Sequence, residues 1–530
     1  MFRNMEPNFD LGEDSTGQLI LRAGYLTVGE ALKNNARIIP DRIAIEYEGG
    51  KLSFAQLNTR VNRLANAMTT IGIARGDRVA VLSENRLEYC EVVYAAAKLG
   101  AIVPCINWRL SADELKYCIT LTAPETIVVS SQNRSLFEEI RGELGFLKRV
   151  VLLDDSPEAE GDMTYRSLIE NGRKVEPLAE VLSEDALTII YTSGTTGYPK
   201  GSIISHRAIF GRAWVWVRDL GLSRKDTFLG WAPMFHMASM DQMLVNGIIG
   251  AKFIPVPGFD PEKLAHYLWT QPLGWFVLIP GTYEPMIEIL QASNRKPVGA
   301  RLVGAMADLV PPQTIAEITR LINCPFLNTF GSTETGLPPA TNSTFGIGEV
   351  PNDFSKKVNT LCEIRLVDPE DKNVPIGEPG ELIIRGPSLC SGYWNNEETN
   401  RSDFRDGWFH MGDVFVMNED GKIHFADRRK YLIKSGGENI YPAEIERVLM
   451  SHAAVEEAIV VRASDPKWGE VPKAYIATRT AVDAEELLQL CKKKLASYKK
   501  PRLFEFVPLE KFPRSTTGKI LRHEVEKWHT

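Results

Sequence analysis

Residues 77–107 alternate two hydrophobic patterns, and this alternation limits the fold more than any other feature of the sequence. DRVAVLS has the pattern of a strand, YCEVVYAAAKLG has apolar residues at helical spacing, and AIVPCIN again has the pattern of a strand. This order predicts a βαβ unit, which favours a mostly parallel sheet with helices on its faces. The same rhythm returns in TIVVSS, RVVLLDD and ALTIIYTSG, and again near KFIPV, GWFVLIP and CPFLNTFG. We therefore predict an α/β fold for the N-terminal part of the chain.

Two segments ahead of this region carry helix signals. In TVGEALKNNARIIP, Thr27 is expected to be the N-cap and Glu30 its capping-box partner. In FAQLNTRVNRLANAMTTIGI, apolar residues recur at helical spacing, and Gly72 is expected to end the helix. Both segments fit helices that cover a face of the predicted sheet.

The pattern changes after about residue 350, where strand patterns are joined by turns that contain proline and glycine. We interpret 350–428 as a small β subdomain within a large N-terminal domain of residues 1–428. Beyond it, the order helix, strand, strand, helix, strand occupies about 100 residues, a length at which a chain can fold by itself. We predict a second, small α+β domain over 429–530, since 530 residues usually exceed one hydrophobic core.

Composition and charge exclude several classes of protein. Hydrophobic residues make up 44% and charged residues 24% of the chain, which argues against disorder, and the net charge of −7 argues against nucleic-acid binding. No apolar stretch approaches the ~18 residues that span a bilayer, and the polar N-terminus lacks a signal-peptide pattern. Seven scattered cysteines without a CxxC pair fit a reducing compartment. We predict a cytoplasmic protein with no transmembrane segment, and a homodimer is left open.

The segment YTSGTTGYPKG, residues 191–201, is dense in glycine and hydroxyl residues and follows an apolar strand pattern. Glycines let backbone N–H groups approach phosphate oxygens, hydroxyls add donors, and Lys200 adds a mobile positive charge. It is not a Walker A loop, because Pro199 precedes the lysine and Gly201 follows it. A polar surface turn is the plainer interpretation, but this density of glycine and hydroxyl groups after a buried strand favours a phosphate-binding loop.

Six motifs in order resemble the signature of the adenylate-forming superfamily, which contains acyl-CoA synthetases, luciferases and the adenylation domains of peptide synthetases. The first is the loop at 191–201, and the others are WAPMFHM (231–237), NTFGSTETG (328–336), DGWFHMGD (406–413), FADRRKYLIKSGGENIYPAEIE (425–446) and PRSTTGKILR (513–522). The resemblance covers nearly the whole chain from about residue 25 and is greatest to stand-alone fatty-acyl- or aryl-CoA synthetases. It implies an acid–thiol ligase, with a role such as fatty acid metabolism. A carboxylate attacks the α-phosphorus of ATP and pyrophosphate leaves; a thiolate, that of coenzyme A, then takes the acyl group and AMP leaves.

By this resemblance, Lys519 contacts both the acid carboxylate and the α-phosphate, a task that suits a compact point charge. Glu334 and Thr192 are implied as holders of Mg²⁺, because that ion prefers oxygen ligands. His236 lies in the aromatic–histidine motif, where the family places the junction of the acyl pocket and the thiol tunnel. We expect it to gate or position rather than to transfer a proton. The catalytic residues implied by the resemblance are Lys519, Glu334, Lys200 and His236.

The nucleotide site is implied in the same way. Asp413 matches the acid that accepts hydrogen bonds from the ribose hydroxyls, and Arg428 matches an arginine that reaches the ribose or the phosphates. Phe330 stands where the family usually has tyrosine and should still stack on adenine. The complete set is Thr192, Ser193, Gly194, Thr195, Thr196, Gly197, Lys200, Phe330, Gly331, Ser332, Thr333, Asp413, Arg428 and Lys519.

The resemblance also implies a mobile C-terminal domain that turns about Lys430 between the two half-reactions. One orientation brings Lys519 to ATP, and the other brings the SGGEN loop to the thiol channel. The channel residues are Ser435, Gly436, Gly437 and Glu438. The basic segment KKKLASYKKPR allows two interpretations equally: a site for the phosphates of coenzyme A, or a solvated helix.

The acid is expected to be apolar, because segment 231–310 is rich in Trp, Met and Phe. A ring or a medium chain would both fit. No Lys or Asp stands out as a partner for an amino-acid head group. Peptide-synthetase domains commonly use an Asp near the aromatic motif to hold an α-amine, and Asp241, five residues after His236, weakens this argument against an amino acid without overturning it. The implied pocket residues are Trp231, Phe235, His236, Met237, Gly304, Ala305, Met306 and Gly331.

Alternatives to a CoA ligase remain. A stand-alone enzyme that loads a carrier protein would use the same motifs, and luciferase-like oxygenation uses the same fold. A catalytically inactive nucleotide-binding protein would be expected to lack charged residues at these positions. The chain retains all of them, namely Lys519, Glu334, Asp413, Arg428 and Lys200.

Overall fold

The computed structural model describes residues 23–24, 26–154, 162–192, 199–435, 438–515 and 519–529. The chain divides into two compact units. Unit 1 comprises the residues up to Trp275, Gly331–Pro338 and Gly386–Ser402, and unit 2 comprises Phe276–Phe330, Pro339–Arg385 and the residues from Asp403 onward. The domain boundary expected after residue 428 stays a prediction.

A seven-stranded sheet in unit 1 has the strand order β7-β6-β5-β3-β4-β8-β9. Every neighbouring pair is parallel except β8 and β9, which form an antiparallel hairpin. The α/β class predicted from the βαβ rhythm is therefore confirmed. The strands are β3 (Val79–Leu82), β4 (Val103–Cys105), β5 (Thr126–Val129), β6 (Arg149–Leu152), β7 (Met163–Thr164), β8 (Ala186–Thr192) and β9 (Lys200–Ser205).

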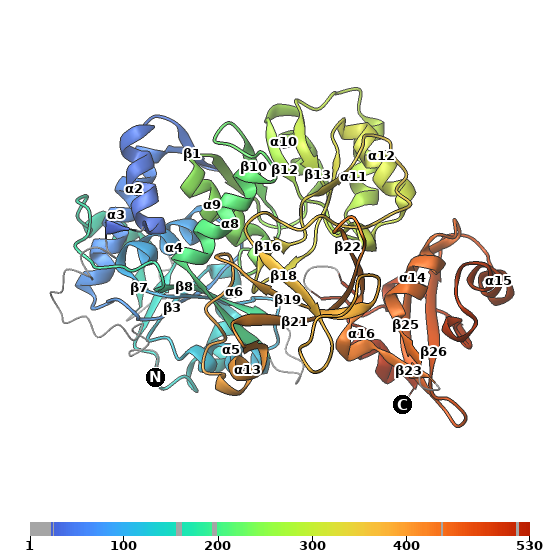
Figure 1. Ribbon diagram of the computed structural model, residues 1–530. Coiled ribbons are helices and arrows are strands. Elements are labelled where there is room, and N and C mark those ends of the chain that lie inside the picture. Colours follow the sequence, from blue (N-terminus) through green and yellow to red (C-terminus); the bar gives the residue numbers. More distant parts are fainter. Residues whose placement is uncertain are drawn as a thin grey trace. The chain divides into compact units, whose positions relative to one another are not determined.

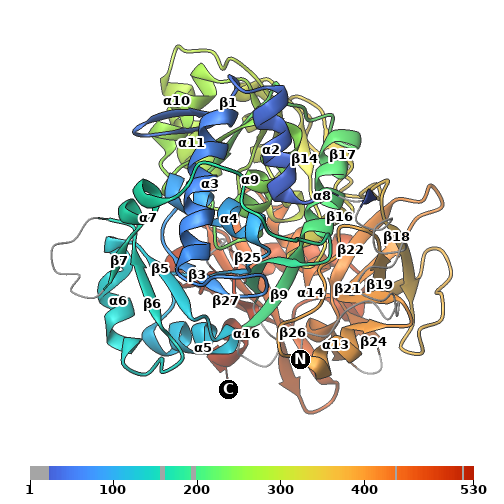
Figure 2. The ribbon, with the colours of Figure 1, turned by 90° about the vertical axis from the view of Figure 1, so that its left-hand side faces the viewer.

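A second sheet has the order β12-β10-β11-β1-β2 within unit 1, with parallel pairing except between β1 and β2. Its strands are β1 (Ile43–Tyr47), β2 (Gly50–Ser53), β10 (Thr227–Gly230), β11 (Lys252–Pro255) and β12 (Leu273–Phe276). A layer of helices contacts both sheets: α4 and α8 touch the seven-stranded sheet, α3 and α9 touch the other, and the helices pack on one another. Figure 1 and Figure 2 show α2, α3 and α4 of this layer side by side. The helices are α2 (Val28–Ile38), α3 (Phe54–Thr70), α4 (Leu87–Leu99), α8 (His206–Arg218) and α9 (Met237–Ile249).

The expected helix ends are confirmed where their signals were strongest. Thr27 caps α2, and its backbone N–H donates to Glu30 Oε2 at 3.0 Å, which completes the capping box. Helix α3 ends at Thr70, and Gly72 follows with φ of +88°, a conformation that glycine adopts at little cost.

Unit 2 contains a five-stranded antiparallel sheet where the small β region was expected, with the order β18-β19-β21-β20 and β22 paired with β21. Strands β13, β14 and β17 form a further part of this unit. The strands are β13 (Ala300–Val303), β14 (Phe326–Asn328), β17 (Ser343–Phe345), β18 (Glu363–Val367), β19 (Pro379–Arg385), β20 (Phe404–Arg405), β21 (Trp408–Met417) and β22 (Ile423–Arg428).

The last hundred residues form a sheet of order β24-β23-β26-β25, with β27 parallel to β26. Alternate residues of β25 face two different cores: Val460 packs with α14 and α15, and Val461 packs with Phe512 and Val525 on the other face. The elements are β23 (Ile433–Ser435), β24 (Glu438–Ile440), α14 (Pro442–Met450), β25 (Val455–Asp465), β26 (Gly469–Thr478), α15 (Ala484–Lys494), β27 (Leu503–Phe506) and α16 (Arg522–Val525).

The remaining elements are short or lie at the edges of the two units. They are α5 (Ala112–Thr122), α6 (Ser131–Arg141), α7 (Tyr165–Asn171), α10 (Pro261–Thr270), α11 (Tyr283–Ala292), η2 (Ala307–Leu309), α12 (Pro312–Ile322), β15 (Gly331–Ser332), β16 (Gly336–Pro339), α13 (Glu397–Asp403), η3 (Arg429–Tyr431), η4 (Ser497–Lys499), η5 (Leu509–Lys511) and η6 (Glu526–His529). Across the described ranges, no helix combines the length and the apolar character that crossing a bilayer requires.

The close packing of β10 on β11 gives a test of the core of unit 1. A Cβ at Gly230 would overlap the buried ring of Phe253, so Gly230→Ala should lower the free energy of unfolding by about 1–3 kcal/mol. Gly142→Ala is the matched control, because Gly142 has right-handed helical φ and ψ and no described atom lies within 4 Å of its added Cβ. Urea unfolding of both variants measures the difference, and equal stabilities would contradict the packing described here.

Candidate active site

The hairpin of β8 and β9 carries both ends of the predicted phosphate loop. Thr192 pairs with Lys200 at the end of the hairpin where the loop joins the two strands, so the two side chains implied in phosphate binding start from neighbouring positions. The next residue, Gly201, has little room for a side chain, because a Cβ there would lie 2.7 Å from Ile189 Cγ2. Ser193, Gly194, Thr195, Thr196 and Gly197 lie outside the described residues.

Glu334 is held beside this hairpin through Tyr393. The Tyr393 hydroxyl donates to Glu334 Oε1 at 3.0 Å, and Lys200 Nζ lies 5.0 Å from the centroid of the Tyr393 ring. The backbone N–H of Cys390 donates to the Glu334 carbonyl oxygen at 2.7 Å. Glu334 is 9% exposed. The structure therefore brings two of the predicted catalytic residues, Lys200 and Glu334, to one tyrosine, the first to its ring and the second to its hydroxyl.

The oxygen atoms offered by Thr192 and Glu334 suit Mg²⁺, as the sequence implied. This ion is bound in phosphate-transfer sites through one or two protein oxygens, with waters and substrate phosphates completing the shell. A carboxylate oriented by a phenol hydroxyl and a hydroxyl at the end of a buried strand match that donor set. The two residues fit the metal that the motif implies.

A buried guanidinium fixes the backbone just before Glu334 and that of the segment at Ser388. Arg212 Nη1, from α8, lies 2.9 Å from each carboxylate oxygen of Asp241 on α9. Its Nη2 donates to the Thr333 carbonyl oxygen at 2.9 Å, and its Nε donates to the Ser388 carbonyl oxygen at 3.2 Å. Burial raises the pKa of the Asp241 carboxyl, and Arg212 opposes that rise. Asp241 is thus engaged inside unit 1 by Arg212, so it no longer weakens the argument against an amino-acid substrate.

The segment around Glu334 depends on glycine at two positions. A Cβ at Gly331 would overlap the carbonyl oxygen of Gly336, and Gly336 has φ of +74° with Arg212 atoms 2.8 Å from its would-be Cβ. The Ser332 N–H donates to Thr335 Oγ1 at 2.9 Å. These contacts define the backbone of β15 and β16, which carry the nucleotide motif predicted at 328–336.

In unit 2, Asp413 and Arg428 are partners in the β21–β22 register, and Arg428 Nε lies 3.2 Å from Asp413 Oδ1. Lys519 lies near both charges, and the backbone N–H of Lys519 donates to Ser515 Oγ at 3.2 Å. Desolvation by the surrounding chain lowers the pKa of the Lys519 ammonium group to about 8, Arg428 adds to this effect, and Asp413 opposes it. The residue still reaches solvent. The structure therefore groups three of the predicted nucleotide residues.

The ring of Phe330 packs with two other aromatic rings of unit 2. Its centroid lies 4.6 Å from that of Phe415 in an edge-to-face arrangement and 5.5 Å from that of Phe425. Its backbone N–H donates to Thr341 Oγ1 at 3.0 Å. The ring predicted to stack on adenine is thus oriented by an aromatic cluster that includes residues of β21 and β22.

His236 is the N-cap of α9, and its Nδ1 accepts from the Ala238 N–H at 3.2 Å. A ring nitrogen that accepts carries no proton, so the neutral imidazole has its proton on Nε2. Trp231 and Phe235 of the same segment are buried, and Met237 is half-buried at the start of α9. The centroid of the Trp231 ring lies 5.3 Å from that of Phe259, and the centroid of the Phe235 ring lies 6.3 Å from that of Trp108.

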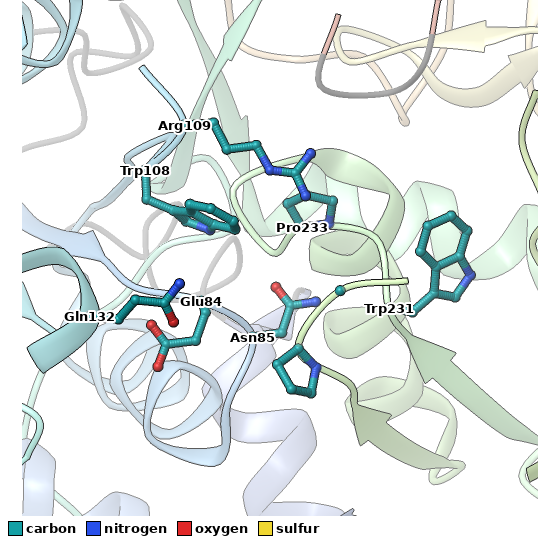
Figure 3. A pocket seen from close by; sticks show the side chains of 9 residues that line it. Glu84, Asn85, Trp108, Arg109, Gln132, Trp231 and Pro233 are labelled. Atoms are coloured by element: carbon teal, nitrogen blue, oxygen red, sulfur yellow. The ribbon is translucent and has the colours of Figure 1, made fainter. Parts of the chain in front are cut away.

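Asn85 ties this aromatic segment to the loop after β3. Its Nδ2 lies 2.7 Å from the carbonyl oxygens of both Gly230 and Ala232, and its Oδ1 accepts from the Met234 N–H at 2.7 Å. Beside it is a small cavity of roughly 80 Å³. Figure 3 shows Glu84 and Gln132 next to each other in this cavity and Arg109 close to Trp108. In the same view, Asn85 lies between Glu84 and Trp231. The lining residues are Glu84, Asn85, Trp108, Arg109, Gln132, Trp231, Pro233, Pro257 and Gly258.

Three further residues expected in the acid pocket, Gly304, Ala305 and Met306, form a turn in unit 2, and the fourth, Gly331, belongs to unit 1. Gly304 has φ of +81°, and a Cβ there would overlap the ring of Phe326. Met306 has φ of +52°, a left-handed conformation that is uncommon for a residue with a side chain, and its N–H donates to Thr329 Oγ1 at 2.7 Å. The Ala305 carbonyl oxygen accepts from the Tyr283 hydroxyl at 3.3 Å.

Lys430, the expected hinge, lies in η3. Next to it, the Arg522 guanidinium lies 4.7 Å from the Tyr431 ring and pairs with Asp427 at 3.0 Å and with Glu446 at 2.7 Å. In the thiol-channel set, Ser435 pairs with Glu438 across β23 and β24; Gly436, Gly437 and the Glu438 side chain lie outside the described residues.

The basic segment that could hold phosphates of coenzyme A is partly engaged in ion pairs. Lys492 lies 3.5 Å from Glu485, Lys499 lies 2.7 Å from Glu444, and Arg502 lies 5.5 Å from the centroid of the Trp468 ring. The first two residues therefore have carboxylate partners within the fold, and both interpretations stay predictions.

Comparison with known proteins gives the family. Residues 32–394 match the family described as AMP-binding enzyme, and residues 444–519 match the AMP-binding enzyme C-terminal domain. The first match alone covers more than half of the chain. The chain belongs to the AMP-binding enzyme family.

Similar proteins extend over almost the full length of this AMP-binding enzyme. A 2-succinylbenzoate–CoA ligase of Bacillus cereus is 34% identical over 506 residues, 94% of this chain and 98% of the ligase. The crystal structure of an anthranilate CoA ligase with anthranoyl-AMP has a TM-score of 0.85 at 26% identity and covers 95% of this chain and 97% of its own. The o-succinylbenzoate CoA synthetase of Bacillus subtilis with its acyl-adenylate has a TM-score of 0.78 at 28% identity, covering 94% and 97%. The predicted adenylate-forming family is confirmed.

Sequence reasoning missed three residues that position the site of this AMP-binding enzyme: Arg212, Asn85 and Tyr393. Each contacts backbone or side-chain atoms far away in the sequence, so no local pattern marks it. The single available signal is at Arg212, an arginine inside the otherwise apolar helical run AIFGRAWVWV.

Removing the Tyr393 hydroxyl tests the arrangement around Glu334. Because a hydrogen bond to a charged group contributes about 1.5–3 kcal/mol, Tyr393→Phe should raise the KM for Mg·ATP by roughly ten- to a hundredfold. Tyr498→Phe, on an exposed tyrosine of η4, is the control and should change nothing. Acid-dependent ATP–pyrophosphate exchange measures the effect, and an unchanged Mg·ATP dependence would contradict a role for Tyr393 in orienting Glu334.

Proposed function

We propose that this AMP-binding enzyme is an ATP-dependent ligase that joins an aromatic carboxylic acid to coenzyme A through an acyl-AMP intermediate. The observation that carries the proposal is the grouping of Lys519 with Asp413 and Arg428, in a chain that matches both family segments. The class of acid is supported by relatives that act on aromatic acids, a 2-succinylbenzoate–CoA ligase and an anthranilate CoA ligase.

In the first half-reaction, a carboxylate oxygen attacks the α-phosphorus of ATP and the bond to pyrophosphate breaks. Attacker and target are both anionic, so positive charge must offset their repulsion. Lys519 would place its ammonium group on the carboxylate and the α-phosphate, and Lys200 would contact the other phosphates. Asp413 would accept from the ribose hydroxyls. Thr192 and Glu334 would hold Mg²⁺, which supplies charge neutralisation when bound.

In the second half-reaction, the thiolate of coenzyme A attacks the acyl carbonyl carbon and the bond to AMP breaks. The Nδ1 of His236 caps α9, which supports a positioning role for this residue rather than proton transfer. Rotation about Lys430 and delivery of the Ser435–Glu438 loop to the thiol channel are part of the proposal and follow from the family resemblance.

An aromatic acid is favoured over the other acids that the sequence left open. The aromatic pairs of Trp231 and Phe235 offer ring surfaces in unit 1, and the carboxylate of Asp241 is occupied by Arg212 instead of facing an amine. A fatty-acid substrate has weaker support, from a Mycobacterium tuberculosis fatty acyl CoA synthetase with a TM-score of 0.75 at 27% identity, covering 94% of this chain and 98% of its own. A cytoplasmic location and a homodimer stay predictions from the sequence.

The role of Lys519 is tested by Lys519→Ala. The variant should lose about a hundredfold or more of acid-dependent ATP–pyrophosphate exchange, because the cation that offsets two anions is gone. Thioester formation from supplied acyl-AMP should stay within about threefold, since that step no longer involves the triphosphate. Lys527→Ala, on an exposed lysine of η6, is the control. Unchanged exchange in Lys519→Ala would contradict the mechanism.

The lowered pKa of Lys519 predicts a pH dependence. A lysine is charged below its pKa, so with a pKa of about 8 the active form dominates at pH 7 and falls to roughly a tenth at pH 9. The kcat/KM for pyrophosphate exchange, which reports the free enzyme, should therefore fall as pH rises through about 8. Lys519→Arg should lose this limb, since arginine does not titrate there. A profile that is flat from pH 7 to pH 9 in the wild-type enzyme would contradict the assignment.

The acid and the acceptor are tested together by a panel of 2-succinylbenzoate, anthranilate, benzoate and a medium-chain fatty acid, assayed for AMP release with and without coenzyme A. An aromatic acid should give the highest kcat/KM, and its turnover should depend on coenzyme A. Preference for the fatty acid would overturn the aromatic assignment. Turnover without any dependence on coenzyme A would overturn the acceptor and direct attention to carrier proteins.

A further inference from the structure

Lys356 is a fully buried lysine of unit 2 whose ammonium group is saturated with acceptors. Its Nζ donates to Asp308 Oδ2 at 2.6 Å, to Asn328 Oδ1 at 2.6 Å and to the Phe354 carbonyl oxygen at 3.2 Å. None of its side chain is exposed. Burial lowers the pKa of this lysine, and the Asp308 carboxylate opposes that change. Three bonds from one ammonium group connect segments that are 28 and 48 residues away in the sequence.

The first partner of Lys356 belongs to the turn expected to line the acid pocket. Asp308 lies in η2, two residues after Met306, and η2 is closed by a bond from the Leu309 N–H to the Met306 carbonyl oxygen at 2.9 Å. Met306 is held at φ of +52°, which costs free energy for a residue with a side chain. A strained turn persists only where its surroundings fix it. The Lys356–Asp308 pair is one of the contacts that do so, beside the bond from the Tyr283 hydroxyl to the Ala305 carbonyl oxygen.

The second partner of Lys356 belongs to the strand that leads to the predicted adenine ring. Asn328 ends β14, two residues before Phe330, and its Nδ2 donates to the Phe354 carbonyl oxygen at 3.1 Å. Thr329, which lies between Asn328 and Phe330, accepts from the Met306 N–H and is a further contact that holds the turn. One buried lysine thus joins the turn Gly304–Met306 to the segment Asn328–Phe330.

A structural role alone does not explain why the Lys356–Asp308 pair is buried. Two charges taken out of water lose hydration that their attraction often does not recover, and apolar residues of similar volume can serve the core as well. Asp308 is moreover incompletely satisfied, since its Oδ1 is buried and has no hydrogen-bond partner among the described residues. A pair that costs stability in this way is expected where it fixes a geometry that the reaction needs.

We propose that Lys356 is a positioning residue for the ligase reaction, which sets the turn Gly304–Met306 against Asn328–Phe330 and thereby the distance between the acid and the adenine subsites. The inference rests on the proposed function, because it assigns those two segments to the acid and the nucleotide. Lys356 touches neither substrate. Its contribution is transmitted through Asp308 to the turn and through Asn328 to the aromatic ring.

Two variants separate these two connections. Lys356→Met removes both and should raise the KM for the acid about tenfold or more and also weaken the binding of AMP. Asp308→Asn weakens the contact with Lys356 but leaves Lys356 bound to Asn328. It should therefore raise the acid KM at least threefold and leave the Kd for AMP within about twofold. Steady-state kinetics with the best acid of the panel, and calorimetric titration with AMP, measure the two effects.

Lys98→Met is the matched control for loss of a buried lysine. Lys98 is 7% exposed, donates to Asn58 and Asn62 at 2.7 and 2.8 Å and pairs with Glu176, all within unit 1 and away from the predicted site residues. It should lower the thermal midpoint and leave the acid KM and the AMP Kd unchanged. If Lys98→Met shifted the acid KM as much as Lys356→Met does, the effect would be general destabilisation and the proposal would be overturned.

The remaining outcomes also decide the matter. Wild-type acid KM in a folded Lys356→Met or Asp308→Asn would overturn the proposal while leaving the ligase function intact. If Lys356→Met did not fold, the acid KM of Asp308→Asn alone would decide. A rise of at least threefold would support the proposal, and a wild-type value would overturn it. If the wild-type enzyme turned over no acid of the panel, the proposed function would fail and this inference would fail with it.

Discussion

Three buried cations of this protein are each paired with at least one carboxylate, and these pairs hold together segments on which the site is built. Arg212 is bound by Asp241 and two carbonyl oxygens, Lys356 by Asp308 and Asn328, and Arg522 by Asp427 and Glu446. Leaving one member of such a pair alone typically costs about 3–5 kcal/mol, so each pair locks the elements that carry it. One of these pairs lies next to each of three segments: the nucleotide motif at 328–336, the turn Gly304–Met306 and the expected hinge at Lys430.

Lys519 differs from these structural cations. It lies near Asp413 and Arg428, reaches solvent, and forms no ion pair with a carboxylate in the described part of the chain. Its charge is therefore not committed within the fold. For a chain with a net charge of −7 that must bring a carboxylate to a triphosphate, this is the property required of the central cation.

The sequence predicted what depends on neighbouring residues. Strand and helix periodicity located β3, α4 and β4, and the capping box at Thr27 marked the start of α2, because these signals act over a few residues. The motifs also contained the residues that the structure groups, such as Asp413 with Arg428. Asn85, Tyr393 and Lys356 could not be predicted, since their partners lie tens to hundreds of residues away. Lys356 lies in the polar segment NDFSKKVN, where a lysine is expected to be solvated, and its burial is visible only in the fold.

The central claim is that the acid carboxylate attacks the α-phosphorus of ATP, and the transfer of oxygen tests it most directly. The enzyme would be given an aromatic acid labelled with oxygen-18 in its carboxylate, together with ATP, Mg²⁺ and coenzyme A, and the phosphorus-containing products would be analysed by mass spectrometry. The account predicts one labelled oxygen in AMP and none in pyrophosphate. Label in pyrophosphate or inorganic phosphate, or AMP without label during thioester formation, would contradict it.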